Sequence, residues 1–145
     1  MIDYEGEEFN RLNENLKTHF DNVEGAYLGT GPGWYNLIYT LTNCIDNHVE
    51  WKNKRDKTDE KLHIAQIKEK FGGLRYYIDG GDETIYGMIR LAESLSFTIC
   101  EECGESGKLR SGGWMKTLCD KHEAERQARY AERKQLELNF YGDEK

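Results

Sequence analysis

Two pairs of potential metal ligands near the C-terminal end constrain the fold of this chain more than any other feature. Cys100 and Cys103 form the first pair, Cys119 and His122 form the second, and fifteen residues separate the pairs. The spacing within each pair lets two side chains converge on one ion, and three thiolates with one imidazole complete the tetrahedral shell of zinc. The histidine argues against the alternative of two disulfides, and free buried thiols are the other alternative. We therefore predict a structural zinc ion.

The segment around these ligands has the outline of a treble-clef zinc finger. Gly104 follows the second cysteine and relieves the tight turn of a knuckle, because glycine tolerates a positive φ. Residues 108–118 are expected to form two short strands around the Ser111-Gly-Gly113 turn. A long helical pattern begins near Asp120 and carries the last ligand. We predict a treble-clef finger with a long C-terminal helix over residues 99–138.

The length and composition of the chain favour one modest domain with a metal-bound extension. The sequence has 145 residues, of which 37% are hydrophobic and 32% charged, so the core is small and a zinc ion would add folding free energy. It contains no long apolar run, and its first residues are acidic, unlike those of a signal peptide. We expect a soluble protein of the reducing cytoplasm, where thiolates stay available to a metal.

The net charge of −7 is concentrated at the N-terminal end. Residues 1–30 contain seven acidic and two basic side chains, whereas residues 31–98 and 99–145 each contain ten acidic and nine basic ones. Binding of nucleic acid through overall charge requires a basic excess, and the sequence has none at this level.

Residues 1–98 are predicted to form a small α+β domain on which the finger docks, since no linker separates the two. Apolar residues recur at helical spacing in three segments, and period-two alternation indicates a hairpin. The predicted elements are helices at about 5–20, 34–56 and 82–97 and a hairpin at about 62–78. Residues 22–33 are interpreted as a connection, and residues 139–145 as a fraying tail.

The Gly29-Thr-Gly-Pro-Gly33 turn contains the only proline of the chain and leads into the second helix. A glycine-rich turn at a helix start can bind an anion or another small ligand, because exposed N–H groups and the helix dipole point at one place. This turn lacks the lysine and spacing of a P-loop and does not match a dinucleotide fingerprint. We interpret it as an entry into the helix.

Several side chains of this domain have the chemistry of catalytic groups but simpler structural interpretations. Cys44 lies on the broad apolar stripe of the second helix and is interpreted as a buried small hydrophobe. His48 is interpreted as a hydrogen-bonded histidine at the edge of the core. Asp79 and Asp82 flank a Gly-Gly turn, so we expect a turn residue and a helix N-cap rather than an acid–base couple.

The predicted hairpin turns at Gly72-Gly73, and strict alternation places Ile64 and Ile67 on opposite faces. The hairpin also carries a small basic patch with aromatic neighbours, and aromatic rings beside cations can stack a base or nucleotide. We favour the simpler interpretation of an ordinary hairpin with one solvent-exposed face. The basic patch and its aromatic neighbours are Lys68, Lys70, Arg75, Phe71, Tyr76 and Tyr77.

The helix that follows His122 is favoured by residue propensity but has a thin apolar side. We expect it to project from the body or to pack against a partner chain, which makes it a candidate surface for self-association. Its apolar residues are Ala124, Ala128, Ala131 and Leu138.

The hairpin and the finger together resemble a group of bacterial and phage proteins to which no activity is assigned. The resemblance rests on Lys68-Glu-Lys-Phe-Gly-Gly-Leu-Arg-Tyr76, on the cysteine pair, and on Gly112-Gly-Trp-x-x-Thr-Leu-Cys119-x-x-His122. It covers about residues 31–123 and implies a zinc-binding domain, located in the host cytoplasm if the protein is phage-encoded. The finger alone is also similar to the treble clef of regulators related to DksA, with histidine in place of the last cysteine.

These features favour a non-enzymatic zinc-binding module that binds and modulates a macromolecular partner, most readily a host or self protein. A shell closed by four protein ligands offers zinc no water to activate, and no nucleophile elbow, HExxH motif or Walker lysine occurs. The alternative is binding of nucleic acid or a nucleotide through the hairpin and the finger strands. Its candidate residues are Lys68, Lys70, Phe71, Arg75, Tyr76, Lys108, Arg110, Trp114 and Lys116.

Overall fold

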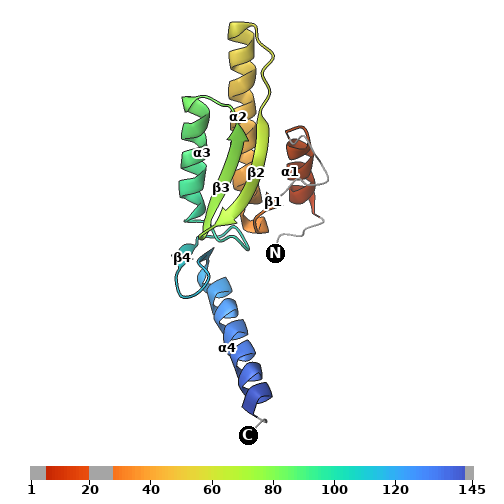
Figure 1. The fold of residues 1–145 in the computed structure, drawn as a ribbon. Helices are drawn as coiled ribbons and strands as arrows, with labels where there is room; N and C mark the ends of the chain where they lie inside the picture. The colour runs from red at the N-terminus through yellow and green to blue at the C-terminus, as the bar shows by residue number, and fades with distance from the viewer. Residues whose placement is uncertain (1–5, 20–27, 143–145) are drawn as a thin grey trace.

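The computed structural model describes residues 6–19 and 28–142 and has an α+β fold with two small sheets (Figure 1). The helices are α1 (Glu7–Lys17), the 3₁₀ turn η2 (Pro32–Trp34), α2 (Tyr35–Asp56), α3 (Glu83–Ser96) and α4 (Asp120–Gly142). The strands are β1 (Leu28–Gly29), β2 (His63–Lys70), β3 (Gly73–Asp79), β4 (Lys108–Arg110) and β5 (Lys116–Leu118). The predicted fold class is confirmed, and each predicted helix and hairpin has a counterpart.

The larger sheet has the strand order β1-β2-β3, with β1 parallel and β3 antiparallel to β2. Figure 1 shows α2 behind this sheet, and α3 packs beside β3. The core between the layers is mainly apolar, and Trp34, Ile38, Ile67 and Leu74 are all fully buried in it. Strand β1 falls in the segment interpreted as a connection, and two residues are too few to show strand periodicity. Residues 22–27 of that segment lie outside the described ranges.

None of the described helices combines the length and apolar character that a bilayer crossing requires.

Because β2 contains a β-bulge, its side chains do not point to the faces of the sheet that strict alternation predicts. Ile64 pairs with Ile78, whereas Gln66 pairs with Tyr77, so one extra residue is inserted between the two registers. The insertion reverses the phase of the alternation, and Ile64 and Ile67 are both buried on the helix side. The prediction that they lie on opposite faces is therefore wrong.

The turn of the β2–β3 hairpin consists of Phe71 and Gly72, not of the predicted Gly72-Gly73 pair. Both residues have a positive φ, 53° and 84°, which is the pattern of a type I′ turn. Such turns favour asparagine at the first position, and a bulky residue there costs on the order of 1–3 kcal/mol. Gly73 begins β3 instead, where a Cβ would lie 2.3 Å from the ring of Phe97.

Two further expectations fail for local reasons. Cys44 is exposed rather than buried, because α2 turns its Leu41 and Ile45 side toward the core and adjacent positions differ by about 100° around a helix. The predicted fraying tail at residues 139–145 is wrong for its described part, since α4 continues to Gly142. No glycine or proline interrupts the helical backbone before that residue.

The interpretations of His48 and Asp82 are confirmed. His48 Nε2 lies 2.7 Å from Asp82 Oδ2, which joins α2 to the start of α3. The other oxygen of Asp82 accepts a hydrogen bond from the backbone N–H of Ile85 at 2.9 Å, as an N-cap does. The hydrogen bond from His48 is the main reason that the pKa of Asp82 is lowered to about 2.

His19 joins α1 to the rest of the domain through both of its ring nitrogens. Nε2 lies 2.9 Å from Asp46 Oδ2 on α2, and Nδ1 lies 3.1 Å from the carbonyl oxygen of Leu62. Both neighbours are hydrogen-bond acceptors, so only the protonated imidazole can donate to both. The hydrogen bond to Asp46 is the largest of the effects that raise the pKa of His19 above its ordinary value of 6.5.

This geometry predicts a pH-dependent contribution of His19 to stability. A group with a raised pKa in the folded state stabilises fully below its unfolded pKa and loses that contribution as the pH rises through the folded value. We expect His19→Gln to lower the melting temperature clearly at about pH 6 and much less at about pH 9. Thermal unfolding of both proteins across this range measures the difference, and a cost that grows with pH would contradict the assignment.

Candidate metal centre

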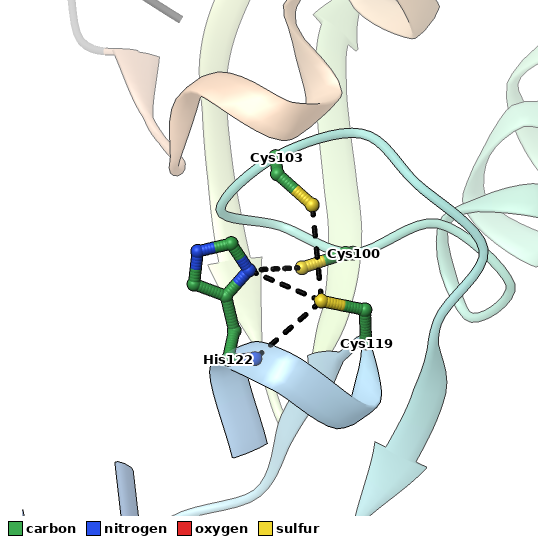
Figure 2. A group of neighbouring side chains, drawn as sticks. All are labelled: Cys100, Cys103, Cys119 and His122. Atoms are coloured by element: carbon green, nitrogen blue, oxygen red, sulfur yellow. Dashed lines mark hydrogen bonds between the residues drawn. The ribbon is translucent and has the colours of Figure 1, made fainter. Parts of the chain in front are cut away.

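The structure brings the four predicted ligands together where the knuckle meets the start of α4 (Figure 2). Their donor atoms all lie within 4.8 Å of one another. Cys100 Sγ lies 3.6 Å and Cys119 Sγ 3.1 Å from His122 Nδ1, and Cys103 Sγ lies 3.8 Å from Cys119 Sγ. None of these three cysteines is joined in a disulfide in the structure.

These separations can be compared with those of a tetrahedral zinc shell. Bonds of about 2.3 Å to sulfur and about 2.0 Å to nitrogen imply sulfur–sulfur distances of about 3.8 Å and sulfur–nitrogen distances of about 3.5 Å. Two of the three separations above agree closely with these values, and the Cys119–His122 contact is shorter. The cluster can therefore hold a metal ion, and its donor set fits zinc.

Local backbone geometry explains how the first two ligands are placed. The N–H of Cys100 donates to the carbonyl oxygen of Glu105 at 2.7 Å, and the N–H of Gly104 donates to that of Cys100 at 2.9 Å. Gly104 has a φ of 80°, as the sequence predicted for this turn. The knuckle then leads into β4, which pairs antiparallel with β5.

The second pair uses the start of α4. The sulfur of Cys119 accepts a hydrogen bond from the backbone N–H of His122 at 3.5 Å, and this contact is the main reason that the pKa of Cys119 is lowered to about 7. Burial raises the pKa of Cys103 to about 11, so a bound cation would be needed to keep that thiol ionised. His122 Nε2 lies 3.9 Å from Glu125 Oε2 one turn further along, which is too far for a hydrogen bond.

Arg126 fixes the direction of α4 and was not singled out by the sequence. It is 6% exposed, and its guanidinium donates to the carbonyl oxygen of Trp114 at 2.7 Å and to Glu123 at 3.0 Å. The first contact ties the second turn of α4 to the loop between β4 and β5. The only sequence signal was an arginine four positions after a metal ligand, which is also common on exposed helix faces.

The glycine-rich turn before α2 serves as the docking site of the knuckle. The N–H of Gly33 donates to the carbonyl oxygen of Glu101 at 2.7 Å, and the indole of Trp34 donates to that of Ile99 at 2.9 Å. A Cβ on Gly33 would lie 2.0 Å from the carbonyl oxygen of Cys100, so only glycine fits. The turn does lead into α2, as interpreted, but Gly31 and Gly33 are required by this non-local contact.

Glu101 is a buried acid that links three segments of the chain. It is 3% exposed, and its carboxylate accepts from the N–H of Gly31 at 2.9 Å and from Lys116 Nζ at 3.1 Å. In the sequence it is one of two glutamates between Cys100 and Cys103, and nothing distinguishes it from its neighbour. Its partners lie 70 and 15 residues away, so no local pattern reports them.

Most of the predicted finger residues for nucleic-acid binding already have partners within the molecule. Arg110 donates to Asp120 and to the carbonyl oxygen of Leu118, and Lys116 is paired with Glu101. Trp114 is 68% exposed, but its Nε1 lies 3.4 Å from Glu69. Lys108 is exposed on β4.

Tyr76 is not available for stacking on a ligand, which corrects that part of the prediction. It is 2% exposed, and its hydroxyl lies 2.8 Å from that of Thr42 inside the core. Burial raises the pKa of Tyr76 above its ordinary value. It pairs with Ile67 across the hairpin, on the helix side of the sheet.

The metal centre predicts a stoichiometric ion that the fold requires. We expect one zinc per purified chain, and a strongly reduced content in Cys103→Ser because three ligands close the shell poorly. The matched control is Cys44→Ser, which removes an exposed thiol of α2 and should keep the zinc. Metal analysis of the three proteins measures their zinc content. A wild-type protein that contains no metal, and whose stability is unchanged by a chelator, would refute the site.

The docking contact predicts opposite effects for two glycine substitutions. Gly33→Ala forces the backbones of η2 and the knuckle apart and should cost about 2–3 kcal/mol of unfolding free energy. Gly87→Ala, on α3 with open space around the position, should stabilise by about 0.5–1 kcal/mol. Denaturant unfolding compares the two, and equal stabilities would show that the close approach is absent in solution.

Comparisons of this chain with protein-family models, with curated proteins and with solved structures found no match. What the chain does must therefore be inferred from its own residues and geometry.

Proposed function

We propose that this chain is a zinc-stabilised, non-enzymatic binding module that uses α4 to contact a protein partner. The observation that carries the proposal is the exposure of the apolar end of α4. The arrangement of knuckle, hairpin and ligand-bearing helix supports the treble-clef assignment.

Helix α4 extends away from the rest of the protein (Figure 1). It has 23 residues, which corresponds to a length of about 35 Å, and Arg126 in its second turn is its one buried residue. Beyond that residue every position of the helix is exposed in the described part of the chain, although most helical stability in proteins comes from packing of one face. The exposed part is thus suited to contact with another molecule.

The last two turns of α4 expose large apolar side chains. Leu136, Leu138, Phe140 and Tyr141 are 63%, 59%, 77% and 71% exposed, respectively. Single apolar residues on a surface are common, but a cluster of this size at the tip of a projecting element is typical of an interaction site. Aromatic and aliphatic anchors of this kind contribute most of the energy at protein–protein interfaces.

The metal centre supports a structural rather than a catalytic role for the ion. Four protein ligands fill the tetrahedral shell, so no position is left for a water molecule or a substrate. The ion would instead hold Cys119 and His122 against the knuckle and so fix the first turn of α4. The resemblance to phage proteins favours a host protein as the partner, and a second copy of this chain is the other candidate.

Site-specific photo-crosslinking in cells tests this proposal. A photoreactive residue at position 140 should give a discrete protein adduct, whereas the same residue at Asp59, in the exposed loop before β2, should not. The substitution Leu136→Ala should weaken the adduct, because it removes an apolar anchor while the helix keeps a good helix former. Equal labelling at both positions, or no adduct at position 140, would refute the proposal.

Light scattering of the purified protein separates the two kinds of partner. A dimer that dissociates in Leu136→Ala identifies a second copy of the chain as the occupant of α4. A monomer that still gives the adduct in cells identifies a different protein.

A further inference from the structure

Phe71 occupies a position that the fold itself does not favour. Its φ of 53° is unfavourable for a bulky side chain, and its ring is 65% exposed. Asparagine would suit the turn better, and packing does not explain the phenylalanine. A residue that is both strained and exposed suggests a role in contact with another molecule and not in the stability of the fold. The ring lies beside Lys70, whose Nζ is 5.6 Å from the ring centroid.

Three cations lie at the end of the hairpin that carries Phe71, on the face of the sheet that points away from α2. Lys68 pairs directly with Arg75 across the hairpin, and directly opposite residues share one face. The neighbouring pair, Ile67 and Tyr76, is buried on the helix side, so Lys68 and Arg75 belong to the other face. Lys70 follows two residues after Lys68 and has the same facing. Figure 1 shows no described helix across this face.

These cations have no carboxylate partners among residues 6–19 and 28–142. Arg75 donates to the carbonyl oxygen of Leu74, and Lys70 contacts Phe71; neither they nor Lys68 forms an ion pair with an acidic side chain there. Like charges directly opposite each other on a hairpin repel. An anion placed between Lys68 and Arg75 would remove that repulsion.

We propose that this face, defined by Lys68, Lys70, Phe71 and Arg75, binds single-stranded nucleic acid. The phosphates would lie along the cations, and an unpaired base would stack on Phe71. Tyr77, which is 40% exposed and two residues from Arg75 on the same face, offers a second ring at the other end. A duplex hides the faces of its bases and cannot use these rings, which is why the single-stranded form is favoured.

Fluorescence anisotropy with labelled single-stranded oligothymidylate tests the proposal on the full, zinc-loaded chain. If three cations neutralise three phosphates, log affinity should fall with log salt with a slope of about −2, which is a loss of about 20-fold between about 50 mM and 200 mM salt. The double variant Lys68→Gln/Arg75→Gln should reduce the slope to about −0.7. The control Lys54→Gln/Arg90→Gln makes the same charge change at exposed positions of α2 and α3 and should leave the slope unchanged.

Phe71→Asn separates binding from folding. Asparagine tolerates a positive φ, so the variant should melt a few degrees higher than the wild type. It should also bind the oligonucleotide at least about fivefold more weakly, because the stacking ring is lost. A merely structural role for Phe71 would move stability and binding in the same direction.

Each remaining outcome overturns the proposal. Absence of binding at about 50 mM salt would do so, since phosphate contacts are strongest at low salt. Equal losses in the two double variants would show that only net charge matters. Equal competition by poly-L-glutamate at matched charge would assign the face to acidic polypeptides, and equal affinity for a duplex would exclude stacking.

Discussion

The backbone contact between the start of α2 and the knuckle is the interaction on which the rest of the structure depends. It includes a hydrogen bond from Gly33 to Glu101 and one from the buried indole of Trp34 to Ile99. Trp34 also belongs to the main hydrophobic core, so the residues next to Cys100 are fixed by that core directly. The metal ligands and the domain core are therefore parts of one packed unit, in which neither can move without displacing the other.

This contact also determines where the two proposed binding surfaces lie. Thr117 of β5 donates to the carbonyl oxygen of Gly72, which holds the tip of the β2–β3 hairpin against the finger. Arg126 holds the start of α4 against the loop between β4 and β5 of the same finger. A finger on a mobile linker would give α4 no fixed direction relative to the sheet. Docking through Gly33, Gly72 and Arg126 gives the projecting helix and the open sheet face a defined arrangement.

The sequence was sufficient to predict the elements and site residues that depend on a local pattern, and insufficient for those that depend on contacts between distant segments. The spacing of Cys100, Cys103, Cys119 and His122 identifies the metal centre, because each pair of ligands converges within one turn. Helical periodicity likewise located α2 and α3 to within one or two residues. The bulge in β2 was missed, because one inserted residue changes the phase of a strand without changing its composition. The docking roles of Gly33 and Glu101 were missed because their partners lie about 70 residues away in the chain.

The net charge of −7 is a poor guide to what this protein can bind, because some of its cations are paired with carboxylates and others are not. Two cations of the finger maintain its architecture: Lys116 is paired with Glu101, and Arg110 with Asp120. Lys68 and Arg75 have no such pairing in the described part of the chain. The acidic remainder of the surface repels a polyanion, whereas the face with Lys68 and Arg75 would attract it, so the excess of negative charge would restrict the proposed contact to that face. An acidic chain can in this way bind a phosphate backbone in one place and one orientation, which a uniformly basic chain cannot do through charge alone.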